Sequence, residues 1–301
     1  MSPFRSEYES ETMQRLYRLD FEAARRCAEK ALTQARADVA CIDTVRTQGA
    51  LLLALHQTAL VYYYIGERAL SEQGIAYHEK MLTAAERLYA RHPVPQTAEL
   101  LAKALVYVAE YLREPLCYKT AEDCYRRAYE LLRDSENKAL IAVTLDHLGD
   151  VAFYTDRTEE AEAHYRAAYE LRVTLTPTYE IRHELAFTHH RMAWICRKRG
   201  DTDGTLRELR ATADALEKLA RDFPLADAQL ALANAYLILG KTLDNEETDA
   251  YIQKAIDIGS TLSEALPDNP LLRRWDQKRR IRFPKSDEDS PLKAHRASSL
   301  E

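Results

Sequence analysis

An internal repeat is the feature of this sequence that most constrains its fold. The segment AEDCYRRAYEL, residues 121–131, recurs forty residues later as AEAHYRAAYEL, residues 161–171, with eight of eleven positions identical. In each copy an alanine is followed by a tyrosine four residues on and by a second alanine three residues further. This spacing places two small residues and one ring on the same face of a helix. A unit repeated at this interval predicts stacked helical pairs, because one unit cannot bury its apolar face alone.

A second helix pattern precedes these segments. Before residue 161, Leu145, Leu148 and Gly149 lead into a turn at residues 155–157. Comparable first-helix patterns occur at Ala59, Tyr62 and Gly66, at Met192, Ala193 and Gly200, and at Leu232, Ala233, Tyr236 and Gly240. A degenerate copy of the repeated second-helix segment occurs at Ala24, Ala28 and Ala31. The alternation of the two patterns resembles the tetratricopeptide repeat family, especially its long-period members in kinesin light chains and bacterial signalling proteins.

The resemblance implies an all-α fold, namely a right-handed superhelical α-solenoid of about six antiparallel helix pairs with a concave groove. Prolines stand near the expected ends of the units, where a helix must stop, at Pro93, Pro95, Pro177, Pro224, Pro267 and Pro270. The predicted units, with a period of about 40 to 47 residues, are 5–42, 43–94, 95–136, 137–177, 178–224 and 225–267. The repeat array is therefore expected over residues 1–267.

Composition agrees with a helical protein that has an apolar core. The chain holds only 8 Gly and 10 Pro, and 46% of its residues are hydrophobic. A net charge of -6 does not favour nucleic acid as a partner. The five cysteines are odd in number and form no CxxC pair, which indicates reduced thiols and a cytoplasmic location. No run of about 18 apolar residues occurs, so no membrane span or membrane partner is expected.

The segment 268–283 is predicted to be a basic capping helix. It starts with Asn269 and Pro270, a cap followed by a first-turn proline, and carries six arginines or lysines around Trp275. The helix is expected to cover the last repeat with Leu271, Leu272, Trp275 and Ile281. The alternative is contact with an anionic partner through the basic side. Residues 284–301 are polar and are expected to form a disordered tail.

No pattern of residues predicts catalysis, a cofactor or a metal. The chain has no phosphate-binding glycine loop and no nucleophile elbow. His183 and Glu184 begin a zinc-protease pattern, but Phe187 stands where its second histidine is required. A metal site remains a minor alternative for four histidines: His147, His183, His189 and His190. The sequence therefore favours a protein that is not an enzyme.

Candidate partner-binding residues follow from the resemblance, since the first helix of each tetratricopeptide pair lines the groove. Counting three residues back, one forward and four to five forward from the small residue of each first helix gives the groove positions His56, Tyr63, Tyr64, Asp146, Asp150, Phe153, Tyr154, His190, Trp194, Arg197, Lys198 and Asn234. Arg191 joins them as a basic neighbour of Trp194. The aromatic members suit peptide recognition, and Trp194 with its basic neighbours forms a patch that could accept a carboxylate. The alternative is that these rings only pack between long helices.

The function expected from this surface is a non-catalytic scaffold or adaptor that binds a protein or peptide. The alternative is a peptide- or ligand-sensing module of a bacterial signalling system. A third interpretation, nucleic-acid binding through residues 273–282, is the least favoured because the whole chain is acidic. Self-association through the short first unit stays open.

Overall fold

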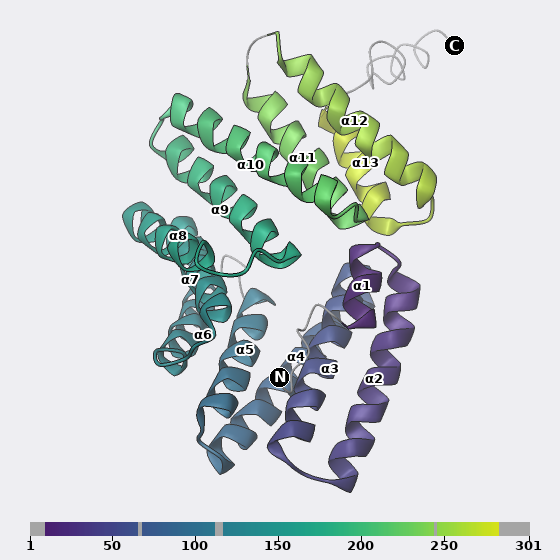
Figure 1. Cartoon of the computed structure of the whole chain (residues 1–301), viewed down its shortest axis with the longest axis vertical. Helices are drawn as coiled ribbons and strands as arrows, with labels where there is room; N and C mark the ends of the chain where they lie inside the picture. Colours follow the sequence, from purple (N-terminus) through teal and green to yellow (C-terminus); the bar gives the residue numbers. More distant parts are fainter. Residues whose placement is uncertain (1–9, 66–67, 112–116, 244–245, 283–301) are drawn as a thin grey trace, which may run out of the picture.

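The chain is an array of α-helices (Figure 1), seen in a computed structural model that describes residues 10–65, 68–111, 117–243 and 246–282. Within these ranges there are thirteen helices and no strand, so the all-α prediction is confirmed. The helices are α1 (Glu11–Tyr17), α2 (Phe21–Cys41), α3 (Val45–Ile65), α4 (Arg68–Arg91), α5 (Pro95–Tyr111), α6 (Tyr118–Leu131), α7 (Lys138–Tyr154), α8 (Thr158–Arg172), α9 (Tyr179–Lys198), α10 (Thr202–Asp222), α11 (Ala226–Thr242), α12 (Thr248–Ala265) and α13 (Pro270–Arg282).

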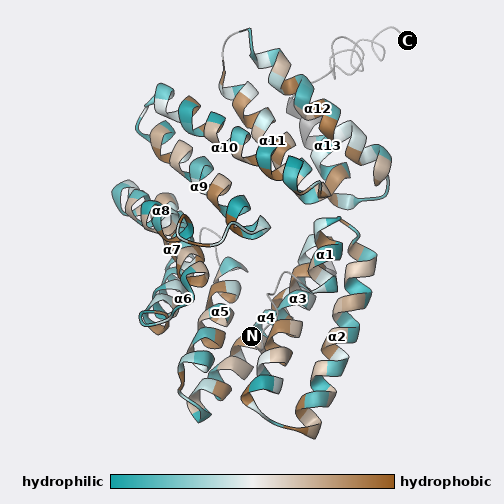
Figure 2. Cartoon of the chain, viewed as in Figure 1, coloured by the Kyte–Doolittle hydropathy of each residue, from teal (hydrophilic) through white to brown (hydrophobic). Residues whose placement is uncertain are grey.

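The first twelve helices form six pairs of neighbours in the order α1–α2 to α11–α12. Each pair lies within one of the six segments expected from the sequence. The first helices α5, α7, α9 and α11 begin at intervals of 43, 41 and 47 residues, which is a long period for such repeats. Hydrophobic residues are interspersed with hydrophilic ones along each helix (Figure 2), as expected for helices that bury one face.

The repeated motif forms the centre of the packing in two adjacent pairs. Its small and aromatic residues are fully buried in both copies: Ala121, Tyr125 and Ala128 in α6, and Ala161, Tyr165 and Ala168 in α8. The tyrosine of the motif requires a residue without a side chain opposite it. A Cβ at Gly149 of α7 would lie only 2.5 Å from Cε1 of Tyr165, which is too close for any larger residue. The absence of that Cβ lets the ring lie against the backbone of α7, so the motif sets the distance between the paired helices.

Polar residues begin the helices where no proline marks the turn. Asn137, at the end of the RDSEN segment, accepts a hydrogen bond from the backbone N–H of Leu140 at 3.1 Å and so caps α7. Asp201 caps α10 in the same way through the N–H of Gly204 at 2.8 Å. Gly200 has φ +75°, a conformation that suits glycine, and lets the chain turn from α9 into α10.

The two ends of the array meet and close it into a ring. In Figure 1 the purple helices α1 and α2 lie beside the yellow α13. The side-chain N–H of Asn269 donates to the backbone oxygen of Leu19 at 2.8 Å, and Leu272 and Trp275 share a hydrophobic core with Phe21. From the sequence, the last helix was expected to cover the last repeat. The structure shows that α13 also contacts α3, so the same helix joins the last repeat to the first pairs.

The capping role predicted for α13 involves Trp275. Its ring fills the space beside Gly259 of α12, and its indole N–H donates to Asn234 of α11 at 3.1 Å. The side chains of residues 278–282, Ile281 among them, and the tail after residue 282 lie outside the described residues. The alternative of an anionic contact through this helix therefore stays a prediction.

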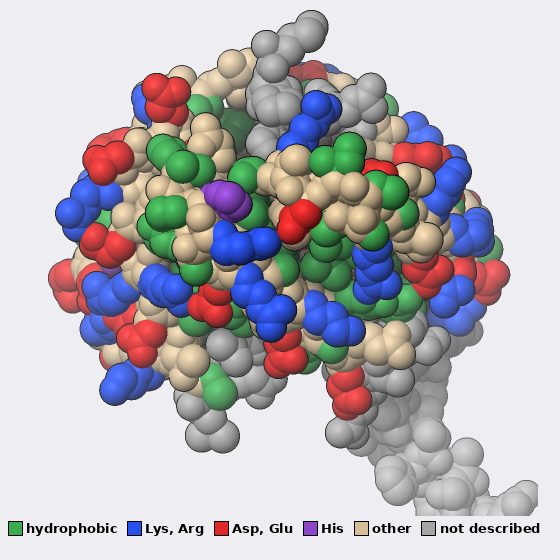
Figure 3. Space-filling model, turned by 90° about the horizontal axis from the view of Figure 1, so that it is seen from below, with side chains coloured by type: hydrophobic (Ala, Val, Ile, Leu, Met, Phe, Trp, Pro, Cys, Tyr) green, Lys and Arg blue, Asp and Glu red, His purple; other side chains and the backbone are tan. Residues whose placement is uncertain are grey.

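The outer surface carries both signs of charge. Seen from below, Lys and Arg side chains lie among Asp and Glu, with hydrophobic side chains between them (Figure 3). Ion pairs also join neighbouring repeats, as between Arg157 and Glu122 at 2.8 Å. Among the described helices, none is long and apolar enough to cross a membrane.

Candidate partner-binding site

Five rings from three helices form one continuous aromatic ridge. Trp194 of α9 is at the centre, with ring centroids 5.7 Å from Phe153, 6.5 Å from Tyr154 and 5.1 Å from His190. Tyr118 of α6 extends the ridge by stacking on Tyr154 at 5.8 Å. Tyr154 is 51% exposed and Trp194 is partly exposed, so the ridge presents aromatic surface to solvent rather than burying it between helices.

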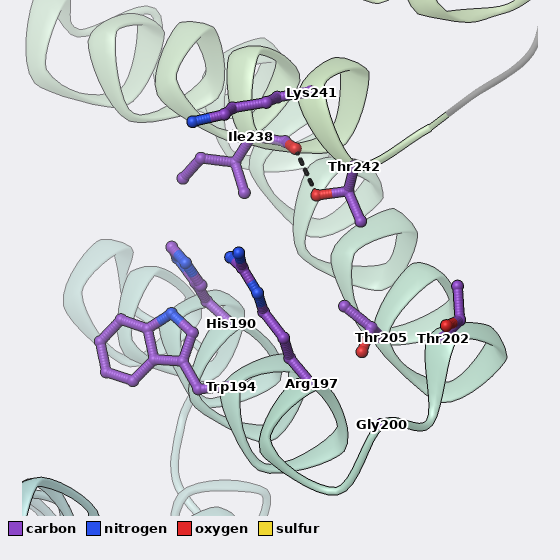
Figure 4. Close-up of a pocket in the computed structure, with 9 residues that line it drawn as sticks. All are labelled: His190, Trp194, Arg197, Gly200, Thr202, Thr205, Ile238, Lys241 and Thr242. Atoms are coloured by element: carbon purple, nitrogen blue, oxygen red, sulfur yellow. Dashed lines mark hydrogen bonds between the residues drawn. The ribbon is translucent and has the colours of Figure 1, made fainter.

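A hollow of about 490 Å³ opens next to the ridge and is called here the cationic hollow (Figure 4). It lies between α9, α10 and α11 and is lined by His190, Trp194, Arg197, Gly200, Thr202, Thr205, Ile238, Lys241 and Thr242. In Figure 4 the side chains of Arg197 and Lys241 reach into it from opposite helices, with the ring of Trp194 at one side.

The charge in this hollow comes from Arg197 and Lys241. Both side chains are exposed, and neither forms an ion pair with any residue in the part of the chain that the structure describes. Burial lowers the pKa of His190 to about 4, and the charge of Arg191 lowers it too, so this imidazole is neutral at pH 7. The hollow therefore offers two uncompensated cations beside an indole ring.

Lys198 supports the ridge and does not add free charge. Its Nζ lies 2.6 Å from a carboxylate oxygen of Asp156 and donates to the backbone oxygen of Phe153 at 3.0 Å. The same atom lies 4.7 Å from the centre of the Phe153 ring. The hydrogen bond from Lys198 lowers the pKa of Asp156, which therefore stays ionised. Lys198 thus fixes the end of α7 against α9.

A network of buried charges joins the helices α7, α8 and α9. Arg172 of α8 lies 2.5 Å from Asp146, and Arg191 of α9 lies 3.4 Å from Asp146 and 3.1 Å from Asp150. Tyr165 donates to Asp150 at 2.9 Å. Burial raises the pKa of Asp146 although both arginines oppose the shift. Burial also disfavours charge on Arg191, but the two carboxylates raise its pKa overall.

This network corrects the predicted role of several groove residues. Asp146 and Asp150 are buried in α7, and the side chain of Arg191 is only 13% exposed. These three residues were expected to face the groove, but they do not present their charges to solvent. Neighbouring pairs cover α7 on both sides, and Arg191 of α9 turns its charge toward the two aspartates. Arg172 completes the network. It was not predicted from the sequence, because it lies at the end of a second helix and only positions on the first helices were counted.

His56 is also buried, with its ring stacked on Tyr107 at 3.6 Å and its Nδ1 3.0 Å from Nε2 of His78. It belongs to the core of the first pairs and not to a groove surface. Tyr63 and Tyr64 are partly exposed, and Tyr64 stacks on Phe21 at 6.3 Å.

Asn234 is exposed but accepts the hydrogen bond from Trp275. The structure places it under α13, away from the ridge.

The histidines weighed as a metal site do not converge. His189 pairs with Glu208 at 2.9 Å, while His147 lies 3.3 Å from Glu110. Over the described ranges, no group of three His, Cys, Asp or Glu residues has the arrangement needed to hold a metal ion. The five cysteines are all free thiols.

These features define the class of the protein as a helical-repeat protein with an aromatic and cationic surface formed mainly by its first helices. Residues 100–172 match the family model described as tetratricopeptide repeat. Over these residues the match confirms the resemblance noted in the sequence, and the described helices before and after them continue the same paired packing.

Two solved structures share this fold. The crystal structure of BtubC (BKLC) from P. vanneervenii is similar with a TM-score of 0.60 and 18% sequence identity, over 81% of this chain and 92% of that one. The apo form of RapI is similar with a TM-score of 0.56 and 17% identity, over 86% of this chain and 82% of that one. No curated protein matches the chain significantly. At these identities the likeness concerns the fold alone.

Proposed function

We propose that the chain is a non-catalytic scaffold that binds a protein partner through a peptide segment lying on the aromatic ridge and in the cationic hollow. One observation carries the proposal, namely two uncompensated cations, Arg197 and Lys241, in a hollow of about 490 Å³ beside the partly exposed Trp194. A cytoplasmic location remains part of the proposal, in line with the free cysteines.

The chemistry of the hollow indicates what the partner offers. A guanidinium binds a carboxylate through two parallel hydrogen bonds, and a lysine nearby adds a point charge. The indole of Trp194 and the ring of Tyr154 supply rigid apolar area, of the kind that carries most of the binding energy in protein interfaces. The segment is therefore expected to place an acidic side chain or a terminal carboxylate next to an apolar or aromatic residue.

The test is a selection of peptides from a random display library on the immobilised full chain. We expect enrichment of peptides in which Asp or Glu adjoins an aromatic or aliphatic residue. Trp194→Ala and Arg197→Glu should each weaken the enriched peptides about tenfold or more. Binding should also weaken as salt is raised, because charges near the surface are screened.

Two matched variants serve as controls. Arg207→Glu reverses an exposed arginine on α10 that does not line the hollow, and Tyr129→Ala removes an exposed tyrosine of α6 outside the ridge. Both should bind the peptides as the unchanged chain does. Enriched peptides that bind Arg197→Glu as tightly as the unchanged chain would refute the proposed site.

A further inference from the structure

A second hollow lies where the two ends of the ring meet, and it has the opposite charge. It has a volume of about 220 Å³ and is called here the central hollow. Five helices contribute to it, with the lining residues Met13, Leu16, Tyr17, Leu19, Leu60, Tyr64, Val143, Tyr179, Glu180, His183, Glu184 and Asp227. Three carboxylates and three tyrosine rings line it, whereas none of these lining residues is a lysine or an arginine.

The carboxylates of the central hollow are only partly compensated by cations. Asp227 accepts a hydrogen bond from the hydroxyl of Tyr179 at 2.8 Å but forms no ion pair within the described ranges, and the same holds for Glu180. Burial alone would raise the pKa of Glu184, but His183 and two nearby arginines lower it to about 2. Those arginines already bind the buried aspartates of α7. Burial lowers the pKa of His183, but the carboxylates of Glu184 and its neighbours raise it overall, so this imidazole offsets part of the charge. Glu180 and Asp227 keep the hollow negative.

The walls of the central hollow suit a cation in a second way. The rings of Tyr17 and Tyr179 lie with centroids 5.0 Å apart, and Tyr64 lines the same space. The face of an aromatic ring attracts an ammonium or guanidinium group, and the attraction grows where water is excluded. Carboxylates and rings together form a site for the head of a basic side chain.

A simpler explanation of these charges is their effect on single helices. Glu180 and Asp227 lie in the first turns of α9 and α11, and Arg197 and Lys241 lie in the last turns of the same helices. Each therefore suits the helix dipole, which accounts for about 0.3–1 kcal/mol of stability per charge. The dipole accounts for the sign of each charge, but not for the tyrosine rings around the acidic group or for the lack of an ion pair at Glu180 and Asp227 within the described ranges.

We propose that the central hollow binds a lysine or arginine side chain of the same segment whose acidic group occupies the cationic hollow. This inference rests on the proposed function and adds a second requirement to the partner. Glu184 and Arg197 are 13 residues apart on α9, which corresponds to about 20 Å along the helix. An extended peptide advances about 3.3 Å per residue, so the basic and acidic residues are expected about six positions apart.

The charges between the two hollows support this spacing. Arg172 pairs there with Asp146, and Arg191 pairs with Asp150. Arg172 and both aspartates are buried, and the side chain of Arg191 is only 13% exposed. The middle of the path therefore offers no net charge to a bound segment. Charge recognition is confined to its two ends, where the uncompensated groups are of opposite sign.

The experiment uses synthetic fluorescein-labelled peptides and the full chain, with affinity measured by fluorescence anisotropy. Each peptide carries a Trp-Glu pair and a single lysine three, six or nine residues away, on either side. A matched set replaces the lysine by norleucine, which keeps the apolar stem and removes the charge. We expect lysine at a spacing of six to bind about tenfold more tightly than its norleucine counterpart.

The acidic residues are tested in a double variant, Glu180→Gln with Asp227→Asn, in which the lysine should bring no advantage. Asp257→Asn with Glu264→Gln makes the same two changes on exposed positions of α12 and should leave the advantage intact. Melting temperatures of both variants separate binding from helix stability. A lysine advantage that persists in the first variant, or that is absent at every spacing, overturns the inference.

The outcomes also separate this inference from the proposed function. If the Trp-Glu peptides bind in a manner that Arg197→Glu abolishes but gain nothing from lysine, the proposed function stands and only the central hollow is wrongly assigned. If none of the peptides binds the unchanged chain, both proposals are refuted.

Discussion

The buried ion pair between Arg172 and Asp146 allows a quantitative test of what holds the repeats together. Both side chains are almost fully buried, with 1% and 2% of their surface exposed, and they belong to different helices of one pair. Arg172→Leu leaves Asp146 with Arg191 as its one remaining cation, at 3.4 Å. Removal of one partner from a buried pair typically costs about 3–5 kcal/mol, because the other charge is left without compensation. We expect a loss in this range.

The magnitude is checked by a double-mutant cycle. Arg172→Leu combined with Asp146→Leu removes both charges and fills the space with apolar atoms. The double variant should recover most of the stability that Arg172→Leu loses, with a coupling of at least about 2 kcal/mol between the two changes. The free energy of unfolding is measured by urea titration with circular dichroism at 222 nm, and the slope against urea should stay constant.

An exposed pair provides the control. Arg126 bonds to Glu122 on α6 with its side chain 54% exposed, so Arg126→Leu should cost less than about 1 kcal/mol. Two results would show that the pair does not stabilise these helices. One is a loss of unfolding free energy below about 1 kcal/mol for Arg172→Leu. The other is a double variant whose loss equals the sum of the losses of the two single variants.

Three further predictions concern stability. Gly149→Ala should cost about 1–3 kcal/mol in urea unfolding, because the added methyl group would overlap the ring of Tyr165, and an unchanged midpoint would contradict the packing described. Asn269→Asp keeps the side-chain oxygen that caps α13 but loses the N–H donor to Leu19 between α1 and α2. It should lower the free energy of unfolding by about 0.5–1.5 kcal/mol and enlarge the radius of gyration in X-ray scattering. Asn269→Ala also removes the cap and should cost more. Burial lowers the pKa of His56 to about 3 and that of His78 to about 2, whereas an imidazole in the unfolded chain titrates near 6.5. The unfolded chain therefore binds more protons below pH 6.5, and the free energy of unfolding should fall by about 2 kcal/mol per histidine between pH 6.5 and pH 5. Replacement of both histidines by leucine should reduce this loss.

Much of the fold was predictable because its signal is local. The spacing of Ala161, Tyr165 and Ala168 identifies one face of a helix, and all three side chains are fully buried. Asn137 begins α7 and Gly200 follows the end of α9, each through hydrogen bonds to residues within a few positions of the chain. Each of these features depends on neighbours that the sequence itself places side by side.

The closure of the ring was not predictable in the same way. It depends on contacts such as that between Asn269 and Leu19, which are 250 residues apart and belong to segments without a shared motif. Small differences in angle between successive pairs decide whether the ends of an array meet. No spacing in a single sequence records those angles.

The candidate site was predicted in part. Trp194, Arg197 and Tyr154 lie on the surface as expected, whereas His56 is buried. The groove positions were counted on the assumption that one face of each first helix is exposed. The helices α3 and α7 are apolar on most of their circumference, so they bury polar side chains together with apolar ones. Lys241 was missed because it follows Gly240, beyond the positions counted on α11.

Closure of the ring also changes how the molecule is expected to lose its structure. In an open array the terminal units have one neighbour each, and unfolding begins by fraying from these ends. Here α13 joins the last unit to the first, so every unit is flanked on both sides. The array then behaves less like a linear chain of independent modules and more like a loop that opens as one cooperative body. Amide exchange should accordingly be slow in the terminal pairs as well as in the middle ones.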